Sequence, residues 1–196
     1  LLTPELFDNN QTMMVHPDRS VNSHRDWGRM IEAELSELKQ DIAIYGQKSF
    51  KEKQLSNFKK AYQDLLKSNT NIADLSVLLD IIPGIIRLTN ITVLNADKKN
   101  YASMKKVKWD DFKYNIVIGG DLLDRGFVVK GLVTTYMPRS KGVGNSDTIQ
   151  QRGRFYGYKK DHIGFIRNWF SEETAKAFKS YVITEEDLYG RLANFS

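Results

Sequence analysis

The 196-residue sequence contains no cysteine, only three histidines and only four prolines. Without cysteine there is no disulfide framework and no thiolate metal site, which fits a reducing compartment, and we expect a cytoplasmic protein. No apolar run is long enough to span a bilayer, so we expect no membrane partner. The histidines, His16, His24 and His162, lack metal-ligand spacing, and we interpret them as structural.

The start of the chain also lacks two features. Leu1 stands where an initiator Met would be, and "LLTPELFDNN" has no basic signal-peptide front. We therefore expect the sequence to be a fragment of a longer protein, with part of its functional site elsewhere.

What is present is typical of one soluble domain, with 41% hydrophobic and 27% charged residues. The charge is unevenly placed, because residues 98–167 hold fifteen Lys or Arg against six Asp or Glu. Such a basic stretch suits nucleic acid or nucleotide phosphate. A solvated lysine-rich face is the simpler alternative.

The first half of the chain predicts one strand followed by helices. "TMMVH" (12–16) is a short apolar run that indicates a buried strand. Apolar residues recur at helical spacing over 23–45, with Ser23 or Asn22 as the N-cap, and again over 49–68. A third, shorter helix begins near residue 71 and is broken by Pro83 and Gly84. We thus expect a helical segment at about 47–88.

The second half changes to β-branched runs, at 91–96, 114–120 and 131–138, with 162–170 as a further candidate strand. Helix starts of the Ser/Thr-x-x-Glu or Thr-Glu-Glu type follow at 171 and 184. Nearly continuous apolar strands indicate a parallel sheet covered on both faces. The sequence therefore predicts a single α/β domain with a helical insertion in its first half.

Three polar, glycine-rich stretches follow the predicted strands: "IVIGGDLLDRGF" (116–127), "MPRSKGVGNSDT" (137–148) and "DTIQQRGRFYGYKK" (147–160). Ligands of parallel sheets bind beyond the carboxyl ends of the strands, so these stretches are expected at one edge. Glycine lets backbone N–H groups approach a phosphate closely, and arginine offers a planar fork for phosphate oxygens. Each stretch alone is a weak signal, and their order and spacing are specific.

The segment "GGDLLDRGFVVKGLVTTYMPRS", followed by "DTIQQRGRFYGY", resembles motifs V and VI of superfamily-two helicase and translocase ATPases. It is closer to the Z1 domain, the C-terminal part of a family of bacterial and phage-type ATPases often labelled endonucleases. "MMVHPDRSVNSH" and "ITVLNAD" also resemble segments of that family. The resemblance runs from about Thr12 to Trp169.

The resemblance implies a second RecA-like motor domain, which completes an ATP site on an upstream P-loop domain. ATP and Mg²⁺ would be held mainly by that domain, and nucleic acid, expected to be DNA, would be the other partner. Arg154 would be the arginine finger at the γ-phosphate, in a motif opened by Gln150. The further implied residues are, for nucleotide, Gly120, Asp121, Arg125, Gly126, Gly153 and Lys159, and, for the nucleic-acid backbone, Arg139, Lys141 and Arg152.

The chain departs from the superfamily pattern at three places. Gly157 stands where a second arginine is usual, Lys159 supplies a point charge rather than a fork, and Val128 replaces a frequent aspartate. There is also no Gly-x-x-x-x-Gly-Lys-Ser/Thr P-loop and no acidic metal box after a strand. We therefore expect no ATP hydrolysis by this chain alone.

Other interpretations stay open at this point. Arg154 could be a sheet-edge arginine paired with Asp121 or Asp147, and Phe155, Tyr156 and Tyr158 could stack on bases or pack beneath a loop. The whole domain could be a binding module for nucleic acid or protein that has lost the motor. An endonuclease is a further alternative, because Pro17-Asp18 and Glu37-Leu38-Lys39 match a short nuclease pattern. Glu37 and Lys39 fall in a predicted helix, which argues against that chemistry.

Overall fold

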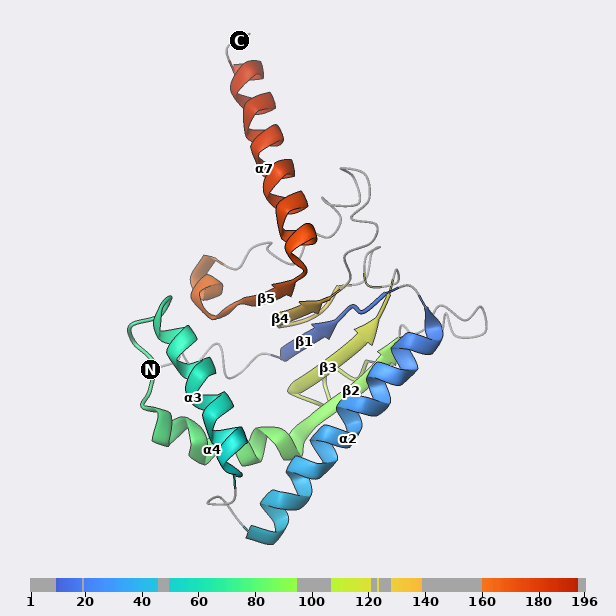
Figure 1. Cartoon of the computed structure of the whole chain (residues 1–196), viewed down its shortest axis with the longest axis vertical. Helices are drawn as coiled ribbons and strands as arrows, with labels where there is room; N and C mark the ends of the chain where they lie inside the picture. The colour runs from blue at the N-terminus through green and yellow to red at the C-terminus, as the bar shows by residue number, and fades with distance from the viewer. Residues whose placement is uncertain are drawn as a thin grey trace.

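The protein is built on a five-stranded sheet, seen here in a computed structural model that describes residues 10–18, 20–45, 50–94, 107–120, 123, 128–138 and 160–193. All strand pairs are parallel, and the spatial order is β2-β3-β1-β4-β5 (Figure 1). The strands are β1 (Gln11–Val15), β2 (Thr89–Leu94), β3 (Tyr114–Gly119), β4 (Leu132–Met137) and β5 (Arg167–Phe170). The predicted α/β class is confirmed, and the arrangement is consistent with a RecA-like fold.

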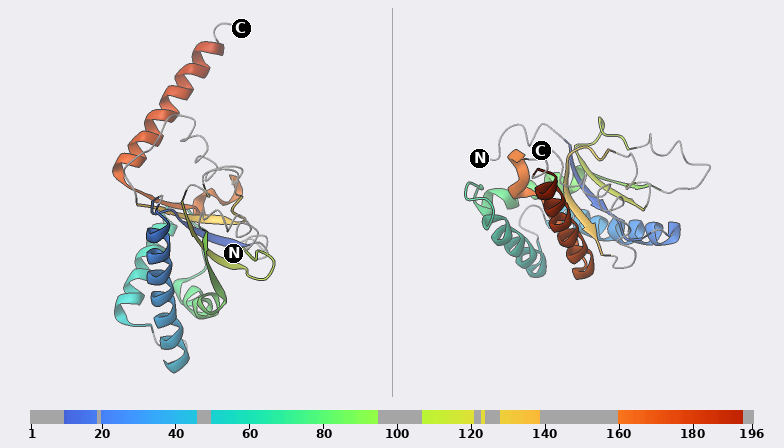
Figure 2. Two further views of the ribbon diagram at one scale, coloured as in Figure 1. Left: turned by 90° about the vertical axis from the view of Figure 1, so that its right-hand side faces the viewer. Right: turned by 90° about the horizontal axis from the view of Figure 1, so that it is seen from above.

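The helices are α2 (Val21–Tyr45), α3 (Glu52–Leu66), α4 (Leu75–Leu88) and α7 (Glu172–Ala193), with a short 3-10 helix, η4 (Lys160–Phe165). Figure 2 shows α2, α3 and α4 on one side of the sheet, whereas α7 projects from the other side. Helix α2 packs on β2 and β3. None of the described helices is both long and apolar enough to cross a membrane.

Two apolar clusters hold these layers together. Met14, Leu94, Val117 and Met137 belong to a cluster on the sheet face opposite α2, which Val107, Leu123 and partly buried Trp109, Val129 and Phe170 complete. A second cluster joins the helices, with Ile42 of α2, Phe50 and Ile86 of α4 buried at its centre. The predicted covering of both faces therefore holds, with a helix on one face and connecting segments contributing to the other.

Three sequence predictions about helices and strands need correction. Helix α4 continues through Pro83 and Gly84, because the buried Pro83 sits beside apolar neighbours that pack against the second cluster. The C-terminal segment is one helix rather than two, since Thr184 Oγ1 donates to the Ser180 carbonyl 2.9 Å away within α7 instead of capping a new helix. Residues 162–170 divide between η4 and β5.

The start of α2 also differs from the prediction. The helix begins at Val21, and Ser20 takes the place of the N-cap, because its Oγ accepts from the Ser23 N–H at 3.5 Å. The Ser20 carbonyl accepts the first helical bond, from the His24 N–H at 3.1 Å. This placement puts the first turn of α2 directly after the end of β1.

Candidate functional site

The carboxyl edge of the sheet is where the predicted site residues should gather. Because every strand is parallel, the chain leaves β1 at His16, β3 at Gly120 and β4 at Pro138 on the same edge. Strands β3 and β4 lie on either side of β1. The two stretches that carry the motif residues, 121–127 and 139–159, therefore start from strands that flank one central strand.

Of the predicted site residues, the structure describes Gly120. The others lie outside the described residues, and their roles stay predictions; they are Asp121, Arg125, Gly126, Arg139, Lys141, Gln150, Arg152, Gly153, Arg154 and Lys159. The described part of the edge is made by the end of β3 and by the connection between β1 and α2.

Gly120 is buried against the β1–α2 connection. A Cβ atom at this position would lie 2.7 Å from the carbonyl oxygen of Asp18 and 2.8 Å from Cε1 of His24. Both distances are shorter than a carbon atom tolerates without movement of its neighbours. The packing around this strand end therefore favours glycine, independently of any ligand.

His24 organises the same corner. Its ring nitrogen Nε2 lies 2.8 Å from the Asp18 carbonyl oxygen, and since a carbonyl only accepts, the ring donates there. The Asp18 carboxylate in turn accepts from the Ser20 N–H at 2.6 Å. The His24 side chain is almost fully buried, as is His16 at the end of β1. These contacts join β1, β3 and the start of α2 into one rigid corner.

The structural interpretation of His16 and His24 agrees with this burial. The contact between His24 and Gly120 was not predicted from the sequence, because the two residues are far apart in the chain and no sequence pattern links them. Within the described ranges, no group of three or more His, Asp or Glu side chains could hold a metal ion. The described corner therefore supplies packing and backbone geometry rather than metal ligands.

The nuclease pattern does not form a site in the described chain. Asp18 precedes α2, whereas Glu37 lies about 24 Å along the helix axis from its first residue, at ~1.5 Å per residue. The Glu37 carboxylate accepts from Lys51 Nζ at 2.7 Å, and Asp41 lies 3.0 Å from the same nitrogen. These two hydrogen bonds raise the pKa of Lys51 above its usual range. Glu37 thus joins α2 to the start of α3.

Sequence reasoning missed a second anchor, which joins the segment of η4 and β5 to α3. Arg167, the first residue of β5, donates from Nε to Asp64 Oδ2 at 2.6 Å and from Nη2 to Ser68 Oγ at 2.9 Å. Its Nη1 also donates to the Gly164 carbonyl at 2.9 Å. The hydrogen bond from Arg167 lowers the pKa of the Asp64 carboxyl. The helical segment is thereby fixed to η4, which directly follows residues 139–159 in sequence.

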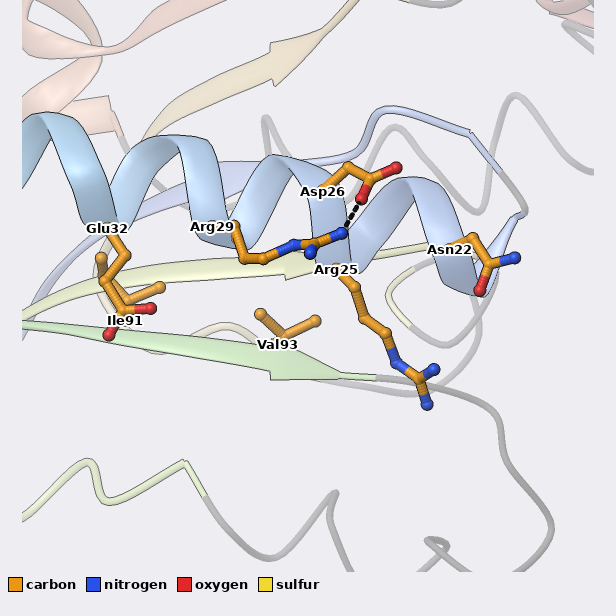
Figure 3. Close-up of a pocket in the computed structure, with 8 residues that line it drawn as sticks. Asn22, Arg25, Asp26, Arg29, Glu32, Ile91 and Val93 are labelled. Carbon is orange, nitrogen blue, oxygen red and sulfur yellow. Dashed lines mark hydrogen bonds and ion pairs between the residues drawn. The ribbon is translucent and has the colours of Figure 1, made fainter.

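A groove separate from the carboxyl corner runs between α2 and β2 (Figure 3). Its volume is about 720 Å³, and its lining comprises Asn22, Arg25, Asp26, Gly28, Arg29, Glu32, Ile91 and Val93. Arg29 bonds to Asp26 on the same helix. No predicted site residue lines this groove.

The comparisons with known proteins bear on the family. A search of curated proteins found no significant match, and a search of solved structures found none either. The family model of the Z1 domain matches residues 4–196, almost the whole chain, and the five parallel strands and the motif-bearing strand ends lie within that range. The chain therefore belongs to the Z1 domain family.

Proposed function

We propose that this Z1 domain is the C-terminal motor domain of a nucleic-acid-dependent ATPase of helicase or translocase type. It would supply residues to an ATP site that is held by an upstream P-loop domain. It would also contact a nucleic-acid backbone, with DNA as the expected substrate. The observation that carries the proposal is that the two motif-bearing stretches follow β3 and β4, the strands on either side of β1, at the carboxyl edge of the sheet.

The order of the residues along the chain supports the same proposal. Gly119 ends β3 and Gly120 follows it, Arg139 comes two residues after the end of β4, and Arg154 lies between β4 and β5 in the sequence. The corner formed by Gly120, Asp18 and His24 holds Gly120 in place, and the motif residues 121–127 follow Gly120 directly in the sequence. Precise placement matters, because stabilisation of a transition-state charge depends on donors that need not reorganise.

In this proposal, Arg154 neutralises charge that develops on the γ-phosphate during transfer to water. Its planar guanidinium can donate two parallel hydrogen bonds to two phosphate oxygens, a fixed geometry that the single ammonium nitrogen of lysine does not provide. Asp121, Arg125 and Gly126 would couple the nucleotide to the nucleic acid, and Arg139, Lys141 and Arg152 would contact the backbone. Among the described residues, no group of His, Asp or Glu side chains suits Mg²⁺, and the proposal assigns its binding to the upstream domain.

The test is ATP hydrolysis by the natural full-length protein, measured with and without added DNA. A motor predicts turnover that rises when DNA is present, and DNA affinity that changes with the bound nucleotide. A binding module on the same fold predicts salt-sensitive DNA binding with no effect of nucleotide. Absence of turnover under both conditions would contradict the motor and leave the binding module.

A further inference from the structure

The sheet ends on one side with β2, which pairs only with β3 in the described part of the chain. Its sequence, TNITVL, has six residues with no charge and no proline. The opposite edge strand, β5, is shorter and carries the charged Arg167. Charges, proline and short length are the usual features that keep edge strands from pairing with other chains. β2 lacks all three.

The wall beside this edge is helix α2, which approaches β2 very closely. A Cβ atom at Gly28 would lie 2.7 Å from Val93 Cγ2, so the glycine permits the contact. Ile91 and Val93 form the floor of the groove along this wall (Figure 3). The groove thus combines an apolar floor with a strand edge that no other described strand pairs with, the two features that serve addition of an extra strand.

The exposed charges of α2 along the groove change sign from one end of the groove to the other. Figure 3 shows Arg25 near the carboxyl end of β2 and Glu32 beside Ile91. Both side chains are exposed, and neither forms an ion pair within the described residues. The two positions are about 10 Å apart along the helix, which equals roughly three residues of a strand. The midpoint between them falls between Arg29 and Gly28, and Gly28 is the residue that approaches Val93.

We propose that the groove binds a second copy of this chain, with the two β2 strands antiparallel about a two-fold axis near Thr92, so that Ile91 lies opposite Val93 of the partner subunit. Reversal of direction places Arg25 opposite Glu32 of the partner subunit, and Glu32 opposite Arg25 of the partner subunit. The apolar floors of the two grooves become neighbours in one continuous sheet. The contact between Arg25 of one copy and Glu32 of the other therefore forms twice, as in any interface with two-fold symmetry.

The charge order favours a second copy over an unrelated peptide. A groove that is positive at one end and negative at the other is complementary to itself only when reversed, which is what a two-fold axis does. Paired in the same direction, like charges would face one another, which is destabilising. The inference does not depend on the proposed ATPase, because the interface lies at a lateral edge of the sheet and leaves the carboxyl edge free.

The test uses light scattering and sedimentation of the chain and of two charge-reversal variants, Arg25→Glu and Glu32→Arg. We expect the unchanged chain to dimerise, and each variant alone to dissociate with a Kd higher by roughly tenfold to a hundredfold. An equimolar mixture of the two variants should form a heterodimer, because Glu at 25 then faces Arg at 32. Lys176→Glu on α7 is the control and should dimerise normally.

The mixing experiment also excludes misfolding as an explanation, since misfolded variants would not restore each other. Circular dichroism of each variant should match that of the unchanged chain, because both positions are exposed. A chain that stays monomeric at its solubility limit would overturn the inference. Dimers that tolerate both single variants, or variants that fail to associate when mixed, would also overturn it.

Discussion

At the scale of single residues, Gly120 links the predicted function to the packing of the fold. The sequence indicates glycine at the end of a strand because backbone can then approach a ligand. The structure adds a second cause, the close contacts of this position with the Asp18 carbonyl and the His24 ring. The two causes select the same residue, so the sequence pattern alone could not separate them.

We predict that Gly120→Ala destabilises the protein by about 1–3 kcal/mol, because the added methyl group must displace backbone or a buried ring. Urea unfolding gives the free energy directly. Gly84→Ala in α4 is the matched control, since no atom lies within 4 Å of a Cβ placed there. That change should stabilise by up to about 1 kcal/mol through helix propensity. Equal effects of the two substitutions would refute the packing argument.

At the scale of secondary-structure elements, Arg167 holds α3 to the η4–β5 segment. Its hydrogen bonds reach Asp64 and Ser68 at the end of α3 as well as the Gly164 carbonyl. A Cβ atom at Gly164 would lie 2.4 Å from Asn69 Oδ1, so the two segments also meet closely. In the sequence Arg167 is one of many basic residues, and no local pattern predicts a contact with an aspartate 103 positions earlier.

Asp64 gives this contact a pH dependence. Arg167 lowers the pKa of Asp64 from its usual 3.8, so the unfolded chain binds a proton more readily than the folded one. The stabilisation is therefore complete above pH 3.8 and is lost as the pH falls through the lowered pKa. We predict that Asp64→Asn lowers stability at neutral pH and removes this acid-side loss.

The measurement for Asp64 is thermal unfolding of the protein and the variant between neutral and acidic pH. Asp187→Asn on α7 is the control, because Asp187 pairs with Arg191 one helical turn away and both side chains are exposed. Its effect should be smaller, as is usual for exposed pairs. Parallel pH curves for the protein and Asp64→Asn would show that the contact with Arg167 does not act this way.

The elements themselves show where sequence reasoning succeeds. Apolar β-branched runs correctly predicted β2, β3 and β4, because strands of a parallel sheet carry apolar residues on both covered faces. Pro83 misled the prediction of α4, since tertiary packing in the helical cluster outweighs one missing backbone hydrogen bond. Helix-start signals inside α7 were equally misleading, because a hydroxyl can bond back along its own helix.

At the scale of the whole molecule, the parallel sheet determines where function is expected. Once the strands are known to be parallel, the carboxyl edge and its three departing segments follow. The contacts inside the corner do not follow, because they depend on how α2 approaches β3 in three dimensions. The sequence therefore predicts at which edge of the sheet the candidate site lies, and the structure adds the contacts among Gly120, Asp18 and His24 at that edge.

The concentration of basic residues in 98–167 leads to a prediction about nucleic acid. We expect DNA affinity to fall steeply as salt rises, because bound lysine and arginine displace counterions from phosphates. Replacing both Arg139 and Lys141 with alanine should lower the slope of log affinity against log salt by about two. Fluorescence anisotropy with labelled DNA measures this slope. An unchanged slope would mean that these residues do not contact phosphate.

The proposed role of Arg154 is best tested by measuring ATP turnover of the full-length protein with and without the substitution Arg154→Ala. Arg191→Ala on α7 is the matched control, since Arg191 pairs only with Asp187 in the described chain. We predict that the Arg154→Ala protein still binds ATP but hydrolyses it on the order of a thousandfold more slowly, whereas the control keeps its rate. Equal turnover by the unchanged protein and Arg154→Ala would contradict the assignment of Arg154 as the arginine finger.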